Sequence, residues 1–110
     1  MRKPLSEDYI RANQDTIDWY DISWSQDLSE DFIREFQDKV DWDHICIEQT
    51  LSEDFIREFQ DKINWCNISY YQTLSSEFIL EFQDKLDIKY ILEYQPLDPE
   101  TREYLKLLKE

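Results

Sequence analysis

A 23-residue period runs through the chain and restricts its fold more than any other feature. When the sequence is cut before each Leu-Ser pair, four copies follow one another without a gap, at residues 5–27, 28–50, 51–73 and 74–96. Two of the copies begin with the same twelve letters, LSEDFIREFQDK. Tandem repeats of about 20 to 50 residues are typical of solenoids, in which each unit buries its apolar face against its neighbours.

Each copy contains the start signals of two helices. Ser29, like its counterparts in the other copies, precedes acidic residues and is a preferred helix N-cap. Asp41 takes the N-cap position of a second segment, as do Asp18, Asn64 and Asp87 in the other copies. Apolar residues follow both starts at helical spacing, and Lys39 suits the dipole near the end of the first helix. We therefore predict two short helices in every copy.

The ends of the array depart from the repeat. Asn13 replaces the phenylalanine that the other copies have at this position. This agrees with the polar outer face that a terminal repeat exposes to solvent. At the other end, Asp98 and Pro99 offer an N-cap and an N1 proline for a final helix within residues 97–110. We expect this helix to cover the last copy with three apolar side chains, Tyr104, Leu105 and Leu108.

The predicted fold is therefore all-α, a single domain over residues 1–110 in which a short α-solenoid of four two-helix repeats ends in a C-terminal capping helix. The absence of glycine agrees with it, because tight hairpins and phosphate-binding loops lack their usual residue. The alternative is a solenoid with one strand per repeat, since residues 68–71 (ISYY) have β propensity. The matching residues 91–94 (ILEY) break the alternation that a strand needs.

The repeat unit also resembles a known group of sequences. LSEDFIREFQDK followed by VDWDHICIEQ or INWCNISYYQ is similar to the short tandem repeats that are abundant in proteins of giant DNA viruses, and the resemblance covers residues 5–96. The first copy departs from the unit at Ala12, Asn13 and Thr16, and the fourth at Ser76, Leu80 and Ile88. The resemblance implies a viral interaction protein without an established chemistry, and it names no target.

The formal charge of −14 narrows the class of partner. Such a chain would be repelled by nucleic acids and anionic membranes, so a protein partner with a basic surface is its natural complement. The four copies carry −5, −5, −2 and −3, which makes the N-terminal half the more acidic one. No apolar run is long enough for a signal peptide or a membrane span, and we expect a cytoplasmic protein, in the host cell if the origin is viral.

The sequence offers no convincing catalytic or metal-binding cluster. His44 lies two residues from Cys46, but two ligands do not make a zinc site, and both are interpreted as surface residues. Cys46 and Cys66 occupy different repeat positions, which favours free thiols over a disulfide. Acid pairs such as Glu30-Asp31 recur at helix starts, where the dipole favours them. We therefore predict no enzyme activity, no metal and no cofactor.

Function is sought where the copies differ, because the shared positions are explained by capping and packing. The differing positions are spaced i, i+1, i+4, so that each trio shares one face of its second helix. Aromatic and aliphatic residues mixed with polar ones are typical of a protein interface, although a drifting solvent face would also vary. The predicted partner-binding residues are Tyr20, Asp21, Trp24, Asp43, His44, Ile47, Asn67, Tyr70, Lys89, Tyr90 and Glu93, and Cys66 shares their pattern.

A second hypothesis uses the acidic surface. A virus-encoded acidic protein could imitate DNA and inhibit a nucleic-acid-binding defence protein of the anti-restriction or anti-CRISPR type, with Glu30, Asp31, Glu35 and Asp38 in the place of phosphates. Four stacked repeats would span about 40 Å, over which duplex DNA carries roughly 24 charges. The chain carries fewer, so DNA mimicry ranks second.

Overall fold

The computed structural model describes residues 4–109, and these residues form helices and turns without a β-strand. The first helices of the four copies are α1 (Glu7–Ala12), α3 (Glu30–Glu35), α5 (Glu53–Glu58) and α7 (Ser76–Glu81). The second helices are α2 (Trp19–Ser25), α4 (Trp42–Glu48), α6 (Trp65–Tyr71) and α8 (Ile88–Tyr94), and α9 (Pro99–Lys109) follows them. The predicted all-α solenoid is confirmed, and the one-strand alternative is wrong.

Side-chain caps start the helices at the predicted residues. The Oγ of Ser29 accepts a hydrogen bond from the Phe32 N–H at 3.1 Å, and the Asp41 carboxylate accepts one from the His44 N–H at 3.3 Å. These bonds satisfy donors that the first turn of a helix leaves without a partner. Helices of two turns or fewer are marginal alone, so packing between copies must stabilise them.

The first helices end earlier than the sequence suggested. Phe36 is already the C-cap of α3, and the N–H groups of Lys39 and Val40 both donate to its carbonyl in a tight turn. Lys39 therefore does not lie at a helix end, and its predicted role with the helix dipole is wrong. The turn reverses the chain so that Val40 is buried and Asp41 can cap the second helix.

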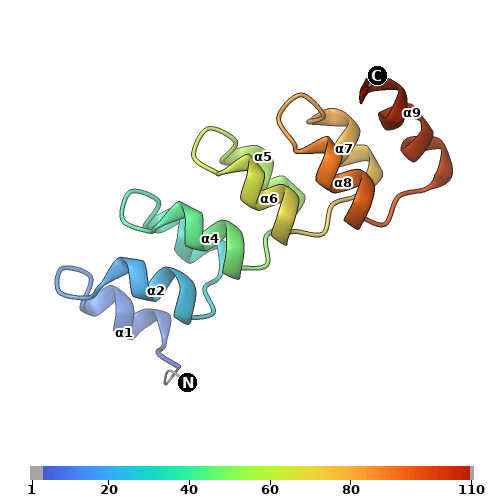
Figure 1. The fold of residues 1–110 in the computed structure, drawn as a ribbon. Helices are drawn as coiled ribbons and strands as arrows, with labels where there is room; N and C mark the ends of the chain where they lie inside the picture. Colours follow the sequence, from blue (N-terminus) through green and yellow to red (C-terminus); the bar gives the residue numbers. More distant parts are fainter. Residues whose placement is uncertain (1–3, 110) are drawn as a thin grey trace.

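The copies stack side by side into an elongated array whose longest dimension is 51 Å (Figure 1). Helices α2, α4, α6 and α8 pack against one another in chain order, and α9 packs against α8. In Figure 1 these second helices form a front row, with α1, α5 and α7 behind them. Among residues 4–109 there is no helix with the length and apolarity that crossing a bilayer requires.

The core repeats from copy to copy. In the second, third and fourth copies, the core contains a phenylalanine and an isoleucine of the first helix and an isoleucine of the second, such as Phe55, Ile56 and Ile68. The half-buried Trp42 lies against the next copy, with its ring centroid 6.2 Å from that of Phe55 and 5.2 Å from that of Phe59. Trp19 and Trp65 make the same contacts one copy earlier and one copy later. Aromatic packing thus joins each copy to the next one.

Helix α9 closes the C-terminal end differently from the prediction. Asp98 is its N-cap, and hydrogen bonds from the Thr101 side chain, from Ser76 and from the Thr101 N–H lower the pKa of Asp98 to about 2. Leu105 is fully buried as predicted, but Tyr104 is 46% exposed and Leu108 is 52% exposed. Thr101 and Leu105, four residues apart, form the buried stripe of α9. Leu108 continues the same helical face near the end of the helix, where it borders an open cleft and stays exposed.

Candidate functional site

A buried glutamine connects each copy to the one before it. The Gln49 amide accepts a hydrogen bond from the Leu28 N–H at 3.0 Å and donates to the carbonyls of Ser23 (3.0 Å) and Gln26 (2.7 Å). Gln72 and Gln95 repeat this pattern in the next copies. These residues were not predicted from the sequence, although a glutamine stands at this position in all four copies. Their role is structural.

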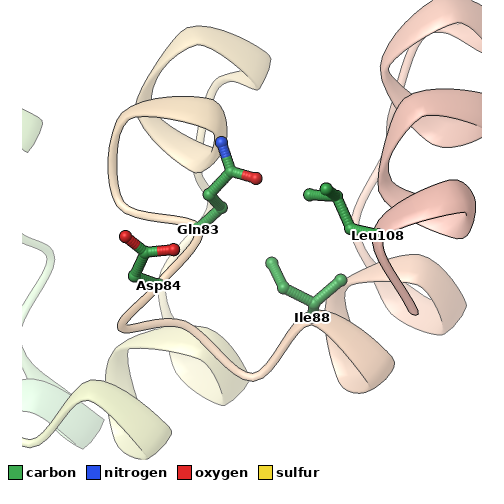
Figure 2. Close-up of a pocket in the computed structure, with 4 residues that line it drawn as sticks. All are labelled: Gln83, Asp84, Ile88 and Leu108. Atoms are coloured by element: carbon green, nitrogen blue, oxygen red, sulfur yellow. The ribbon is translucent and has the colours of Figure 1, made fainter. Parts of the chain in front are cut away.

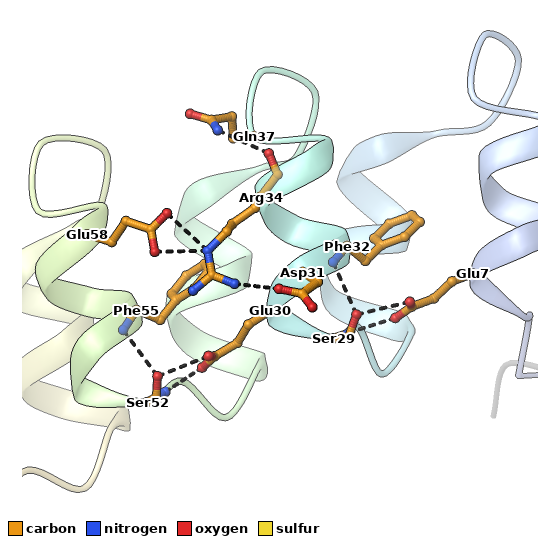
Figure 3. Close-up of polar contacts among 10 residues, drawn as sticks. All are labelled: Glu7, Ser29, Glu30, Asp31, Phe32, Arg34, Gln37, Ser52, Phe55 and Glu58. Atoms are coloured by element: carbon orange, nitrogen blue, oxygen red, sulfur yellow. Dashed lines mark hydrogen bonds and ion pairs between the residues drawn. The ribbon is translucent and has the colours of Figure 1, made fainter.

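The acidic starts of the first helices bind the next copy (Figure 3). The Glu30 carboxylate accepts hydrogen bonds from the Ser52 N–H at 2.6 Å and from its Oγ at 3.0 Å. Glu7 makes the same pair of contacts with Ser29. The glutamate of one copy therefore holds the N-cap serine of the next, which explains why both recur at a fixed spacing.

Arginines form a second set of bridges along the first helices. In Figure 3 the Arg34 guanidinium lies between two carboxylates, 2.7 Å from an oxygen of Asp31 and 2.9 Å from one of Glu58. It also lies over the Phe55 ring, 5.3 Å from the centroid. The hydrogen bond with Glu58 raises the pKa of Arg34, and the equivalent bond from Arg11 lowers the pKa of Glu35. These side chains are solvent-exposed, so the bridges align the copies more than they stabilise them.

The four residues predicted as an acidic surface all have partners within the array. Glu30 binds Ser52, Asp31 pairs with Arg34, and Glu35 pairs with Arg11. The Asp38 carboxylate lies 3.1 Å from the Nζ of Lys62 in the next copy. Basic side chains are thus interspersed among the acids on this side of the molecule.

The predicted partner-binding residues all lie on the second helices, and none belongs to the core. Two of them meet across neighbouring copies, since the rings of Tyr20 and His44 are 4.3 Å apart and perpendicular. Asp43 accepts a hydrogen bond from the Asn64 amide at 3.4 Å. The exposed members are Tyr20, Trp24, Asp43, Cys66, Tyr70, Lys89 and Glu93, and the half-buried members are Asp21, His44, Ile47, Asn67 and Tyr90.

Four tyrosines gather at the C-terminal half of this face. We call Tyr70, Tyr71, Tyr90 and Tyr94 the tyrosine cluster. The Tyr90 ring lies 4.4 Å from that of Tyr70 and 4.6 Å from that of Tyr94, and the Tyr70 ring lies 6.5 Å from that of Tyr71. Tyr71 and Tyr94 are 57% and 63% exposed. The cluster therefore presents aromatic surface to solvent.

Two members of the tyrosine cluster, Tyr71 and Tyr94, were not predicted from the sequence. Tyr71 and Tyr94 share a repeat position with Ser25 and Glu48, so this position also differs among the copies. The i, i+4 spacing of Tyr90 and Tyr94 was a second available signal.

Hydrogen bonds hold the inner side of the tyrosine cluster. The Tyr70 hydroxyl donates to the Asp87 carboxylate at 2.9 Å, which raises the pKa of Tyr70. The Tyr90 hydroxyl donates to the Tyr70 carbonyl at 3.4 Å. Two of the four rings are therefore oriented before any partner binds, which reduces the conformational entropy that binding would cost.

The structure corrects the interpretation of Cys46 as a surface residue. Its side chain is fully buried, and burial raises the pKa of the thiol to about 11. Cys46 occupies the repeat position of Ser23 and Ser69, whose hydroxyls accept hydrogen bonds from the backbone of the following copy. His44 is half-buried beside Tyr20. In the described part of the chain, no three potential metal ligands lie together.

The fold and the surface together define a helical-repeat solenoid with an exposed, aromatic second-helix face. The chain matches no protein-family model, no curated protein and no solved structure.

Proposed function

We propose that this protein is a non-catalytic helical-repeat module that binds another protein through the solvent-facing side of α2, α4, α6 and α8. One observation carries the proposal: large aromatic side chains are exposed on this side at the positions where the copies differ. Tyrosine and tryptophan are enriched among the residues that dominate binding energy at protein interfaces. Neighbouring exposed aromatics on a soluble protein are typical of interaction sites.

The contacts of the residues that the copies share support the second-helix side as the binding face. The glutamates, arginines and serines of the first helices already contact the next copy, as Glu30, Arg34 and Ser52 show. The aromatic side chains of the second-helix face contact one another and leave much of their surface in solvent. The second-helix residues that leave much of their surface in solvent can vary to fit a partner.

Charge indicates the kind of partner. The chain carries −14, and acids such as Asp43 and Glu93 lie among the aromatic side chains of the second-helix face. A partner with basic residues around an apolar centre would match this arrangement and would be steered toward it. From the resemblance to repeats of giant DNA viruses, we further propose that the module acts inside a host cell, as an inhibitor or adaptor.

DNA mimicry is less well supported by the same observations. Along 51 Å, duplex DNA carries about 30 charges at one per 1.7 Å, whereas the net charge of the chain is −14. The acids of the first helices also bind arginines, lysines and serines of the array. A mimic needs a continuous row of accessible negative charge, and these internal pairs interrupt it.

Site-specific photo-crosslinking tests the proposal. A photoreactive phenylalanine analogue would replace Tyr71 on α6 or, as the matched control, Asp54 on α5, because both side chains are exposed but lie on different helix rows. In cells where the protein acts, we expect a protein adduct from position 71 and none from position 54. An adduct only from position 54, or release of the partner by duplex DNA, would contradict the proposal.

A further inference from the structure

The last junction of the array lacks the large side chains that fill the other three. Counting in steps of 23 residues, Ile88 stands where the earlier copies have tryptophan. Thr101 and Leu105 of α9 stand where the next copy would supply two phenylalanines. At the inner junctions, the tryptophan ring packs on both of these rings. Three smaller side chains therefore meet at the one junction that a capping helix closes.

An open cleft occupies this place (Figure 2). Its volume is about 330 Å³, and it is lined by Gln83, Asp84, Ile88 and Leu108. Figure 2 shows the side chains of Ile88 on α8 and Leu108 on α9 near each other, with Gln83 and Asp84 across the opening from them. The volume falls at the lower end of the range for small-ligand sites, about 300–1,000 Å³. The cleft combines two apolar walls with one polar edge.

The earlier copies show how this place holds an indole. At the three inner junctions, the tryptophan Nε1–H donates to a backbone carbonyl five residues earlier, at 3.0 Å for Trp19 with Gln14, 2.9 Å for Trp42 with Gln37 and 3.2 Å for Trp65 with Gln60. Gln83 is the fourth member of this glutamine series. Ile88 has no side-chain N–H, and among the side chains described for residues 4–108 no other one donates to the Gln83 carbonyl.

The turn that holds the Gln83 carbonyl keeps the geometry of the earlier copies. The C-cap Phe82 has φ −113° and ψ 25°, against −111° and 29° for Phe36. The Lys85 N–H donates to the Phe82 carbonyl at 2.9 Å, as the Lys39 N–H does to the Phe36 carbonyl. The fourth copy thus keeps the hydrogen-bond acceptor for an indole without containing the indole.

The lysine that pairs with the matching aspartate of earlier copies is also replaced beside the cleft. Asp15 pairs with Lys39 and Asp38 pairs with Lys62, in each case a lysine of the following copy. Asp84 has the same repeat position, but Leu108 stands where the next lysine would be. Asp84 is exposed at the edge of the cleft, so a ligand with a positive charge can approach it.

We propose that the cleft between α8 and α9 binds a tryptophan side chain of a partner protein, next to a lysine or arginine of the same segment. The indole N–H donates to the Gln83 carbonyl, the ring packs against Ile88 and Leu108, and the basic residue pairs with Asp84. This site is separate from the second-helix face and does not depend on the function proposed for it.

A second copy of the chain is a poorer occupant than a foreign segment. The N-terminal copy presents Tyr9, Asn13 and Thr16 where an inner junction uses two phenylalanines and a lysine. The exposed Trp24 is flanked by serines and has no neighbouring base for Asp84. The chain therefore does not supply the pair of groups that the cleft lacks.

Peptide titration of the full-length, isotope-labelled chain, followed by NMR, tests the proposal. The probe is the blocked tripeptide Lys-Trp-Lys, and we expect saturable shifts at Gln83, Asp84, Ile88 and Leu108. Replacing the tryptophan by 1-methyltryptophan removes the donor and should weaken binding about fivefold. Glu-Trp-Glu should bind more weakly still. No shifts at the cleft, or equal affinity for the methylated peptide, would overturn the proposal.

Two variants locate the site. Ile88→Trp supplies the internal indole and should abolish the peptide shifts, whereas Ile88→Val keeps the cleft open and should bind like the wild type. Asp84→Asn tests the same site without touching the core. It should weaken Lys-Trp-Lys severalfold and leave the affinity for N-acetyltryptophanamide unchanged. Undiminished Lys-Trp-Lys binding by Asp84→Asn, or by a folded Ile88→Trp, would show that the peptide binds elsewhere.

Discussion

Helices α3 and α5 have the same sequence, EDFIRE, whereas α4 and α6 share only a tryptophan and an isoleucine. The two rows also differ in what their exposed side chains contact. On the first-helix row, carboxylates and guanidinium groups bind the neighbouring copy. On the second-helix row, aromatic side chains cluster with one another and remain accessible.

This difference shows why some positions of a repeat vary and others do not. A side chain that contacts the next copy must fit its own helix and the helix that follows, as Arg34 does with Asp31 and Glu58. A side chain such as Tyr71 has its surface in solvent and is not held to a fixed partner. In an array whose stability comes from nearest-neighbour contacts, such positions are available for binding.

The largest expected effect concerns the shared core. Phe59→Ala removes a buried ring that packs on Trp42 and Phe55, and it should lower the free energy of unfolding by about 3 to 5 kcal/mol. Asn13→Ala changes the same repeat position in the terminal copy, where the side chain is only half-buried, and should cost less than about 1 kcal/mol. Denaturant titration gives both values. Equal losses would contradict the stacking order of the copies.

The reactivity of the two cysteines also distinguishes the shared core from the second-helix face. Cys46 lies in the shared core with a pKa of about 11, against an ordinary value of 9.0, while Cys66 is exposed on the second-helix face. Since the thiolate is the reactive form, the pKa alone should slow alkylation of Cys46 at pH 8 by about 100-fold, and burial should slow it further. Mass spectrometry after iodoacetamide treatment should find Cys66 modified first. Equal rates in the folded protein would place Cys46 outside the core.

A smaller effect is expected at the buried glutamines. Gln72→Ala leaves the Leu51 N–H without its acceptor and two carbonyls without their donor, and it should cost about 2 to 3 kcal/mol. Gln60→Ala is the control, because its half-buried amide makes a single local bond to the Arg57 carbonyl and should cost less than about 1 kcal/mol. Thermal and denaturant unfolding distinguish the two. A loss no larger for Gln72 would mean that the amide network does not join the copies.

The architecture could be predicted from the sequence because its signals are local. Ser29 and Asp41 mark helix starts whether or not the neighbouring copy is known, and the 23-residue period supplies the stacking. The contacts between copies could not be derived in this way. Nothing in its own helix marks Cys46 as buried, but in the array its side chain is fully buried and the Asn64 backbone of the next copy forms a hydrogen bond with it. Its burial depends on how closely two helices approach.

The candidate surface could be predicted in part, because its helical positions also follow from a local pattern. The i, i+1, i+4 pattern correctly placed Tyr70 and Tyr90 on accessible or half-buried second-helix positions. It could not show that their rings meet across copies, because that contact joins residues 20 apart on different helices. The cleft beside Ile88 likewise requires the position of α9, which no local pattern gives.

One comparison of two multiple variants tests the central claim most directly, namely that the first-helix side joins the copies and the second-helix side binds the partner. The first variant changes Trp24, Ile47 and Tyr70 to alanine, and the second changes Glu30, Asp31, Glu35 and Asp38 to the matching amides. Melting temperature and affinity for the crosslinked partner would be measured for both, at low and physiological salt.

The alanine variant should stay folded with only a small loss of melting temperature, and it should lose more than about 1 kcal/mol of binding energy per anchor, with only a modest salt dependence. The amide variant should melt at a slightly lower temperature, because exposed ion pairs contribute little to stability, and it should retain its affinity. The opposite outcome, intact binding by the alanine variant and lost binding by the amide variant with a steep salt dependence, would contradict the account and favour DNA mimicry.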